Sequence, residues 1–192
     1  MNQEKLMLIV KYDPDTGDFF WLNRSENTHS MFMSEESMHS VSHSTKLWNS
    51  RNAFKKIGSK SHGYLEVRIS NRLYRLHSLA WLYVYGEIPN RIDHKNGIRS
   101  DNRIINLRVC TQSENCKNSA KRANNTSGFT GVYFFKRLNK WAAKIVCDGK
   151  QIHVGCFDTP ELADSARKLK LKEYGFHENH GRDQHDEYKK RA

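Results

Sequence analysis

Apolar and polar positions alternate most regularly in YLEVRISNRLYRLHSLAWLYVYG, residues 64–86. Apolar side chains alternate with charged ones over residues 65–69, and the pattern resumes after the pair Ser70-Asn71. Alternation on both sides of a two-residue break predicts a β-hairpin. Residues 77–85 then place apolar side chains at helical spacing before a glycine and a proline, which predicts a core helix.

The following stretch, RIDHKNGIRSDNRIINLRV, predicts two more strands around a loop. Residues 91–94 form the first strand, Asn96-Gly97 opens the loop, and residues 104–110 form the second strand. The second strand is expected to turn Ile105, Leu107 and Val109 to one side.

A helix is expected directly after this strand. Thr111 and Glu114 have the spacing of a capping box, in which a hydroxyl and an acid three residues later satisfy the first backbone N–H groups. The helix should therefore run from about Gln112 toward Lys121.

The N-terminal part of the chain predicts one ordered arm and one irregular segment. In KYDPDTGDFFW the turn residues DPDTG precede an aromatic run, which favours a hairpin. Residues 25–48 are rich in Ser, Met, His and Asn without clear periodicity, so we expect a long surface loop or a partly disordered insert. Its histidines His29, His39 and His43 are expected to be solvated rather than metal ligands.

A second module follows the linker NNTSGFTGV. Its pattern predicts three strands, with a tight Asp148-Gly149 turn between the last two, and then a helix that begins at Thr159 and ends near Tyr174. The strands are expected at residues 132–136, 141–147 and 151–157. The tail from His177 onward is expected to be a flexible end.

Composition and charge narrow the class of protein. The 192 residues carry 32 Lys and Arg against 21 Asp and Glu, a formal net charge of +11, and 37% of them are hydrophobic. Such an excess of positive charge is typical of nucleic-acid or anionic-surface partners. No apolar stretch is long enough for a membrane span or a signal peptide, so we expect a soluble, cytoplasmic protein with no membrane partner.

The four cysteines do not have the spacing of a zinc site. They occur singly, without the C-x-x-C pairs that tetrahedral zinc usually takes. We therefore expect free thiols and no structural zinc. The cysteines are Cys110, Cys116, Cys147 and Cys156.

Metal-assisted cleavage of a phosphodiester needs a base, a cation and a group that orients the base. His94 can act as the base because its ordinary pKa is near neutral. Asp93 and the amide oxygen of Asn115 are hard oxygen ligands that suit Mg²⁺. Asn106, on the partner strand, can fix the tautomer of His94 by a hydrogen bond to its other ring nitrogen.

These residues resemble the HNH family of His-Me finger nucleases, in particular those related to phage and intron homing endonucleases. The resemblance lies in DHKNG, DNRIINLR and TQSEN, with 12 residues from His94 to Asn106 and 21 from His94 to Asn115. It implies an α+β fold with a ββα-metal core after an N-terminal hairpin extension. It also implies Mg²⁺, with Mn²⁺ as a substitute, and hydrolysis of double-stranded DNA. Asn115 stands where the family commonly has a histidine, as in many relatives of this subtype, so it does not indicate an inactive site.

The second module resembles the plant ethylene-response-factor (APETALA-type) DNA-binding domain. The resemblance lies in SGFTGVYF, KWAAKI and GKQIHVGCFDTPELA. It implies a small three-stranded sheet plus helix whose sheet lies in the major groove. The alternative is a β3α domain with a purely structural sheet, in which Trp141 packs on the helix and the Lys and Arg side chains form a solvated face.

The domain boundaries follow from these two resemblances. We expect an HNH nuclease domain at residues 1–123 with its core at about 89–122, a DNA-binding domain at 124–178 and a tail at 179–192. His77, at a helix start, is expected to have a structural or phosphate-contacting role. DNA contacts are expected from Arg75, His77, Arg91, Arg99, Arg103, Arg108, Lys117, Lys121, Arg122, Arg137, Lys140, Trp141, Lys144 and Lys150.

Two functions therefore compete. The first is an Mg²⁺-dependent endonuclease, phage-encoded and homing-like, that acts as a monomer on double-stranded DNA. The second is a DNA-binding regulator with an inactive nuclease core. All four residues that the catalysis needs, Asp93, His94, Asn106 and Asn115, are present, which favours the endonuclease.

Overall fold

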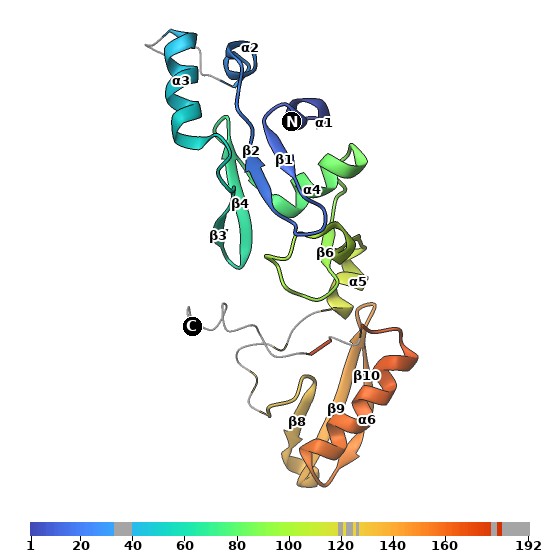
Figure 1. Cartoon of the computed structure of the whole chain (residues 1–192). Helices are drawn as coiled ribbons and strands as arrows, with labels where there is room; N and C mark the ends of the chain where they lie inside the picture. The colour runs from blue at the N-terminus through green and yellow to red at the C-terminus, as the bar shows by residue number, and fades with distance from the viewer. Residues whose placement is uncertain (33–39, 119–120, 122–124, 126, 178–179, 182–192) are drawn as a thin grey trace. The chain divides into compact units, whose positions relative to one another are not determined.

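A computed structural model describes residues 1–32, 40–118, 121, 125, 127–177 and 180–181 (Figure 1). It contains small antiparallel sheets and helices, a mixed α+β architecture as predicted. The chain divides into two compact units. The first comprises Met1–His94 and Ile98–Val109, and the second comprises Lys95–Gly97 and Cys110–Ala192. Within the described ranges, no helix has the length and apolar character needed to cross a membrane.

Three antiparallel sheets build the first unit. The predicted N-terminal hairpin is confirmed, as is the hairpin at residues 64–76, where Ser70 and Asn71 both have positive φ and form the turn. A third strand, β3, was not predicted. The strands are β1 (Val10–Tyr12), β2 (Phe19–Trp21), β3 (Ser59–Ser61), β4 (Tyr64–Ile69), β5 (Arg72–Arg75), β6 (Ile92–His94) and β7 (Leu107–Val109).

The core of this unit lies around α4. Leu76, Leu79, Ala80 and Leu82 of this helix are buried, and Gly86 ends the helix in the left-handed conformation, as the sequence predicted. The helices are α1 (Gln3–Met7), α2 (Glu26–Ser30), α3 (Val41–Asn52) and α4 (Leu76–Tyr85), with a short 3₁₀ helix, η1 (Ile104–Asn106).

Two predictions in this unit are wrong. Much of residues 25–48, expected to be irregular, lies in α2 and α3, each capped by a serine side chain; His39 falls outside the described residues. The expected strand at 104–110 is instead η1 followed by β7. Only Leu107 turns into the core, while Ile105 is 75% exposed and Val109 is 52% exposed. The 3₁₀ turn breaks the alternation on which the prediction rested.

The second unit contains α5 (Gln112–Lys117) and a sheet covered on one face by α6 (Pro160–Glu173). The expected capping box of α5 is present: Glu114 N–H donates to Thr111 Oγ1 at 3.2 Å, and Thr111 N–H donates to the Glu114 carboxylate at 2.7 Å. The helix nevertheless ends at Lys117, earlier than predicted.

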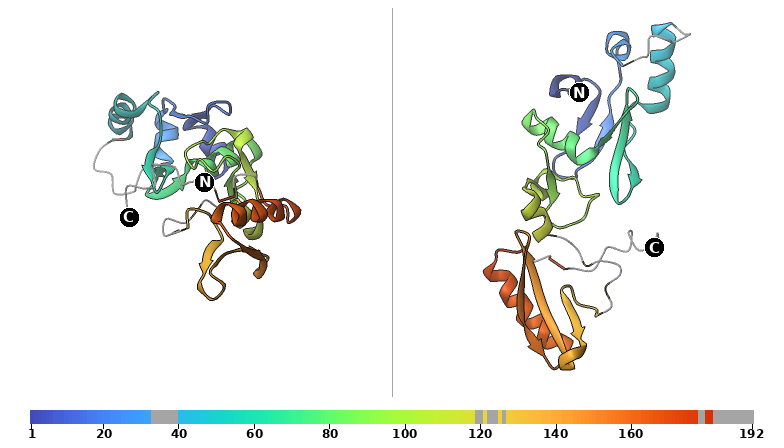
Figure 2. Two further views of the ribbon diagram at one scale, coloured as in Figure 1. Left: turned by 90° about the horizontal axis from the view of Figure 1, so that it is seen from below. Right: turned by 180° about the vertical axis from the view of Figure 1, so that it is seen from behind.

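The order of the sheet is β10-β9-β8, with the predicted Asp148-Gly149 turn between β9 and β10. Helix α6 lies along one face of this sheet (Figure 2). Alternate residues of β9 face α6, and Trp141 and Ala143 pack on that side with Val132 and Ala163. The strands are β8 (Val132–Phe135), β9 (Lys140–Cys147) and β10 (Lys150–Phe157), and η2 (Lys136–Leu138) joins the first two. Beyond residue 177 only His180 and Gly181 are described, so most of the expected tail lies outside the described residues.

Candidate active site

One short strand of the first unit, β6, carries both the acid and the histidine. Asp93 pairs with Arg108 and His94 pairs with Leu107 in the antiparallel register of β6 and β7. Because neighbouring residues of a strand point to opposite faces, Asp93 and His94 meet different surroundings. Both are buried, with 9% and 4% of their surface exposed.

The Asp93 carboxylate is held by the guanidinium of Arg108. Arg108 Nη2 lies 2.8 Å and Nε 3.1 Å from Asp93 Oδ2. Charge-assisted bonds of this kind are about twice as strong as neutral ones. The expected metal ligand therefore has a cationic partner within its own sheet.

His94 is oriented by a residue that sequence reasoning did not single out. Its Nε2 lies 3.5 Å from Oδ1 of Asn102, a long contact of the kind that catalytic groups often show without substrate. An amide oxygen only accepts hydrogen bonds, so the His94 tautomer with its proton on Nε2 is the one that would donate to Asn102. Asn102 is 1% exposed.

The loop around Asn102 is fixed from two sides. The Tyr12 hydroxyl donates to the Asn102 carbonyl at 2.7 Å, and Asn106 Nδ2 donates to the neighbouring carbonyl of Asp101 at 2.8 Å. Tyr12 belongs to β1, so the N-terminal hairpin supports the loop. Asn106, predicted to orient His94, holds the backbone next to the residue that contacts it.

Gly17 explains how closely the hairpin approaches this loop. Its φ is +77°, and a Cβ at this position would lie 2.5 Å from the backbone nitrogen of Arg103 and 2.7 Å from the carbonyl carbon of Asn102. Any side chain would push the hairpin turn away from the loop. The motif YDPDTGDFF thus contributes directly to the geometry of the site.

Two aromatic rings enclose His94 on its other side. His77 packs edge-on with ring centroids 5.0 Å apart, and Tyr64 lies 6.1 Å from His94 and 5.4 Å from His77. Burial lowers the pKa of His94 below its ordinary value, and burial beside His94 and Arg75 lowers the pKa of His77 to about 3. Both rings are therefore neutral near pH 7, as a proton-accepting base requires.

His77 lies within the protein rather than on its surface. It is 6% exposed, and its Nδ1 is buried without a hydrogen-bond partner. Of the two roles considered for His77, this position favours the structural one. Its contact with DNA remains a prediction.

Two arginine side chains lie over the ring of Tyr64, which is close to His94 and His77. The guanidinium carbons of Arg75 and Arg99 lie 4.3 Å and 5.0 Å from the centre of the Tyr64 ring. Arg75 also lies 3.6 Å from the Glu66 carboxylate, and Arg99 donates to the carbonyl of His62. These two predicted DNA contacts thus share a surface with the enclosure of His94.

Other predicted DNA contacts have partners within their own unit. Arg103 forms a bidentate pair with Asp101, and Lys117 and Lys121 donate to the carbonyls of Tyr174 and Gly128. Arg91, Arg137 and Lys150 are exposed, whereas Arg122 lies outside the described residues.

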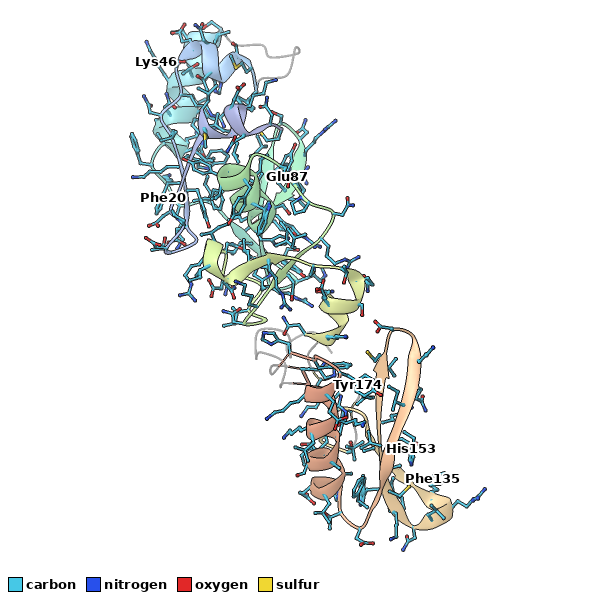
Figure 3. The ribbon with its side chains drawn as sticks, turned by 90° about the vertical axis from the view of Figure 1, so that its right-hand side faces the viewer. Phe20, Lys46, Glu87, Phe135, His153 and Tyr174 are labelled. Carbon is cyan, nitrogen blue, oxygen red and sulfur yellow. The ribbon has the colours of Figure 1, made fainter. Side chains whose placement is uncertain are left out.

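The sheet of the second unit separates the predicted contacts onto two faces. Lys144 lies on the open face, with Nζ 5.1 Å from the Tyr133 ring centre and 3.2 Å from Oε1 of Gln151. Lys140 has the same orientation and pairs with Asp158. Trp141 faces the other way, where it packs, partly buried, against the cluster that includes Ala163 of α6, and its ring meets Phe134 edge-on. Its contact with DNA remains a prediction. Figure 3 labels Phe135 and His153, which share the open face.

The donor set suits a hard cation with few protein ligands. Across the described ranges, no three His, Cys, Asp or Glu side chains gather into a group that could hold a metal. Magnesium commonly binds through one or two carboxylates, with water and substrate phosphates supplying the rest, so Asp93 fits this ion. Asn115 is half-buried on α5, in the second unit. Its pairing with Asp93 as a ligand remains a prediction from sequence.

Comparison with known proteins identifies the region that contains this site. Residues 74–117 match the family model described as HNH endonuclease, so this part of the chain is an HNH endonuclease domain. The chain is also similar to "Protein 3.8" of Escherichia phage T7, with 33% identity over 79 residues, which cover 40% of this chain. Those residues span 65% of the phage protein's length. No solved structure matches the chain.

The geometry around Asn102 predicts two different losses. Asn102→Ala should lower the maximal cleavage rate about tenfold or more, because positioning groups of this kind commonly contribute 10- to 100-fold. Asn106→Ala should lower it less, since Asn106 acts through the backbone. Neither change should alter the Mg²⁺ concentration needed for half-maximal cleavage. Metal titrations on one plasmid substrate test this, and a raised metal requirement for either variant would show that its side chain binds the ion.

Proposed function

We propose that the protein is an Mg²⁺-dependent endonuclease that hydrolyses phosphodiester bonds of double-stranded DNA. One observation supports it above the rest: within the region that matches the HNH model, His94 is buried with its Nε2 3.5 Å from Oδ1 of Asn102, and Asp93 precedes it on the same strand. Mn²⁺ is expected to replace Mg²⁺, since both accept hard oxygen ligands.

In this proposal each residue has a separate task. His94 accepts a proton from the attacking water through Nδ1, and Asn102 keeps the proton on Nε2 so that this lone pair stays available. Asp93 holds the cation, with Asn115 as its second protein ligand. A cation held there would supply positive charge against the phosphate and the leaving oxygen. His77 and Tyr64 exclude water from the back of the His94 ring.

Arg108 is proposed to exchange partners when substrate arrives. Without DNA it neutralises Asp93 through the contacts at 2.8 and 3.1 Å. A DNA phosphate is an alternative partner for the same guanidinium, which binds phosphate and carboxylate equally well in geometry. Release of Asp93 by Arg108 would then couple DNA binding to metal binding.

The open face of the second unit's sheet is proposed to hold the DNA. Lys140, Lys144 and the Tyr133 ring share this face, and Lys and Arg contacts to phosphates supply most of the affinity of sequence-independent binding. Similarity to a phage protein supports a phage origin for the chain, and a homing-like role is part of this proposal. Which bases the sheet reads is a separate question from whether it binds.

The double variant Lys140→Gln, Lys144→Gln should bind DNA more weakly and with less salt dependence. Each lost phosphate contact lowers the slope of log K against log salt by about 0.9, so the slope should fall by about 2. Lys168→Gln, Lys172→Gln on α6 removes the same charge from the other side of this unit and is the matched control. The slopes of log K against log salt are measured by fluorescence anisotropy on a mixed-sequence duplex. Equal slopes for the two double variants would show that the open face does not bind DNA.

Cleavage of plasmid DNA tests the proposal as a whole. Supercoiled plasmid should be converted to nicked or linear forms with Mg²⁺ or Mn²⁺ and should stay intact in EDTA. The rival function, a DNA-binding regulator with an inactive core, predicts a gel shift in EDTA and no conversion with either metal.

A further inference from the structure

Helix α3 packs on the surface of the first unit and contributes little to its core. In its 12 residues, only Thr45 is buried. Trp48 and Asn49 make its main contacts. The Trp48 ring lies 3.6 Å from the Arg24 guanidinium carbon and packs edge-on against Trp21, and the Asn49 side chain bonds to both the N–H and the carbonyl of Arg24 at 2.9 Å. Such a helix buries little apolar surface, so we look for its function in the surface that it exposes.

Phe54, directly after this helix, has an unusual combination of exposure and backbone geometry. Its side chain is 73% exposed, and its φ is +64°. A left-handed conformation costs a non-glycine residue about 1–2 kcal/mol, and it is especially uncommon for bulky ones. Glycine or asparagine would occupy this position with less strain.

Strand β2 holds Phe54 in this conformation. Phe54 N–H donates to the Trp21 carbonyl at 2.8 Å, and Trp21 N–H donates to the Lys55 carbonyl at 3.0 Å. Ile57 N–H then donates to the Phe19 carbonyl at 2.8 Å. The ring is thus presented to solvent from a fixed backbone.

The charge around Phe54 indicates the chemistry of its partner. Residues 40–65 contain five Lys and Arg and no Asp or Glu. Arg51 and Lys55, three residues before and one after Phe54, are exposed. A protein partner would need a contiguous apolar patch, whereas a single ring among cations suits a polyanion with stacked aromatic bases.

We propose that Phe54 is an intercalating wedge that enters between base pairs of duplex DNA, while Arg51 and Lys55 bind the adjacent phosphates. The inference rests on the proposed function only in requiring that the protein binds DNA. Apolar wedges of this kind unstack a base step and unwind the duplex locally. Lys46 of α3, labelled in Figure 3, is a further exposed cation of this segment.

Unwinding can be measured without a known recognition sequence and without cleavage. The full-length chain with His94→Ala is incubated in EDTA with plasmid and a topoisomerase that needs no metal, and the plasmid is then freed of protein. A wedge leaves the plasmid negatively supercoiled in proportion to bound protein. Phe54→Gly, in the same background and at equal occupancy, should abolish this shift and weaken binding at least about fivefold, whereas Phe54→Trp should retain both.

Phe54→Gly should also raise the melting temperature by a few degrees, because it relieves the left-handed strain. That result excludes misfolding as the cause of the lost shift, and Phe54→Asn provides a second variant that tolerates the backbone. Tyr85→Ala, which removes an aromatic side chain that is 55% exposed on α4, is the matched control and should leave the shift unchanged.

The outcomes separate this inference from the proposed function. An unchanged topoisomer shift in Phe54→Gly overturns the wedge, as does DNA binding by the parent protein with no shift at all. In both cases the nuclease proposal stands. Absence of any plasmid binding by the parent protein would instead contradict the proposed DNA substrate, and the wedge with it.

Discussion

Replacement of His94 by alanine is expected to lower the cleavage rate by about 10²–10⁴-fold, the usual contribution of a positioned general base. DNA affinity should change less than about threefold, because the base acts in the transition state and contributes little to phosphate binding. Single-turnover cleavage and anisotropy binding on the same DNA measure the two quantities separately.

Imidazole added to the medium gives this prediction a positive control. The cavity left by His94→Ala lies between Asn102 and the ring of His77, so a small base can occupy the same place. Imidazole should therefore restore part of the rate for His94→Ala and none for Asp93→Asn, whose lost group has a different task. Wild-type cleavage by His94→Ala without imidazole would remove His94 from the mechanism.

The hairpins and α6 could be predicted because their signals are local. Alternation on either side of Ser70-Asn71, and Thr159 before Pro160, describe what the backbone does within a few residues. The capping box at Thr111 is a signal of the same kind, and it located the start of α5 correctly. The helix end was less predictable because no glycine or proline follows Lys117 directly.

Helices α2 and α3 could not be predicted in this way because distant contacts hold them. The side chains of Trp48 and Asn49 reach Arg24, more than 20 residues earlier, and nothing in the local pattern of residues 25–48 records this. A serine N-cap at Ser25 and at Ser40 was the only local signal available. Tertiary contacts here override a weak helical pattern.

The candidate site shows the same division. The sequence placed Asp93 and His94 correctly on the strand that is β6, whereas Asn106 lies in η1 and not on the expected partner strand. The contact to His94, however, comes from Asn102, which looks like an ordinary loop residue in the sequence. Its role depends on Tyr12 and on the close approach of Gly17, both more than 80 residues away in the chain. Support of this kind becomes visible only when the hairpin and the loop are seen together.

The pair Asp93 and Arg108 predicts metal effects of opposite sign. Asp93→Asn should raise the Mg²⁺ concentration needed for cleavage about tenfold or more, because it removes the charged ligand of an ion with few protein groups. Asn115→Ala should raise it less, since only a neutral oxygen is lost. Without DNA, Arg108→Gln should lower the metal concentration needed for binding, because the metal no longer competes with Arg108 for Asp93. A hydrogen bond to a charged group is worth about 1.5–3 kcal/mol.

Binding of Mn²⁺, followed by electron paramagnetic resonance, measures these effects apart from catalysis. For the wild type, added DNA should tighten Mn²⁺ binding, because phosphates draw Arg108 away from Asp93. For Arg108→Gln, binding should be about tenfold tighter than wild type without DNA and should gain less when DNA is added. The variant Arg103→Gln, which loses a similar exposed pair with Asp101, is the matched control and should keep the wild-type gain. If added DNA tightens Mn²⁺ binding equally in Arg108→Gln and Arg103→Gln, then Arg108 does not exchange Asp93 for a DNA phosphate. Its pair with Asp93 would then serve only to join β6 and β7.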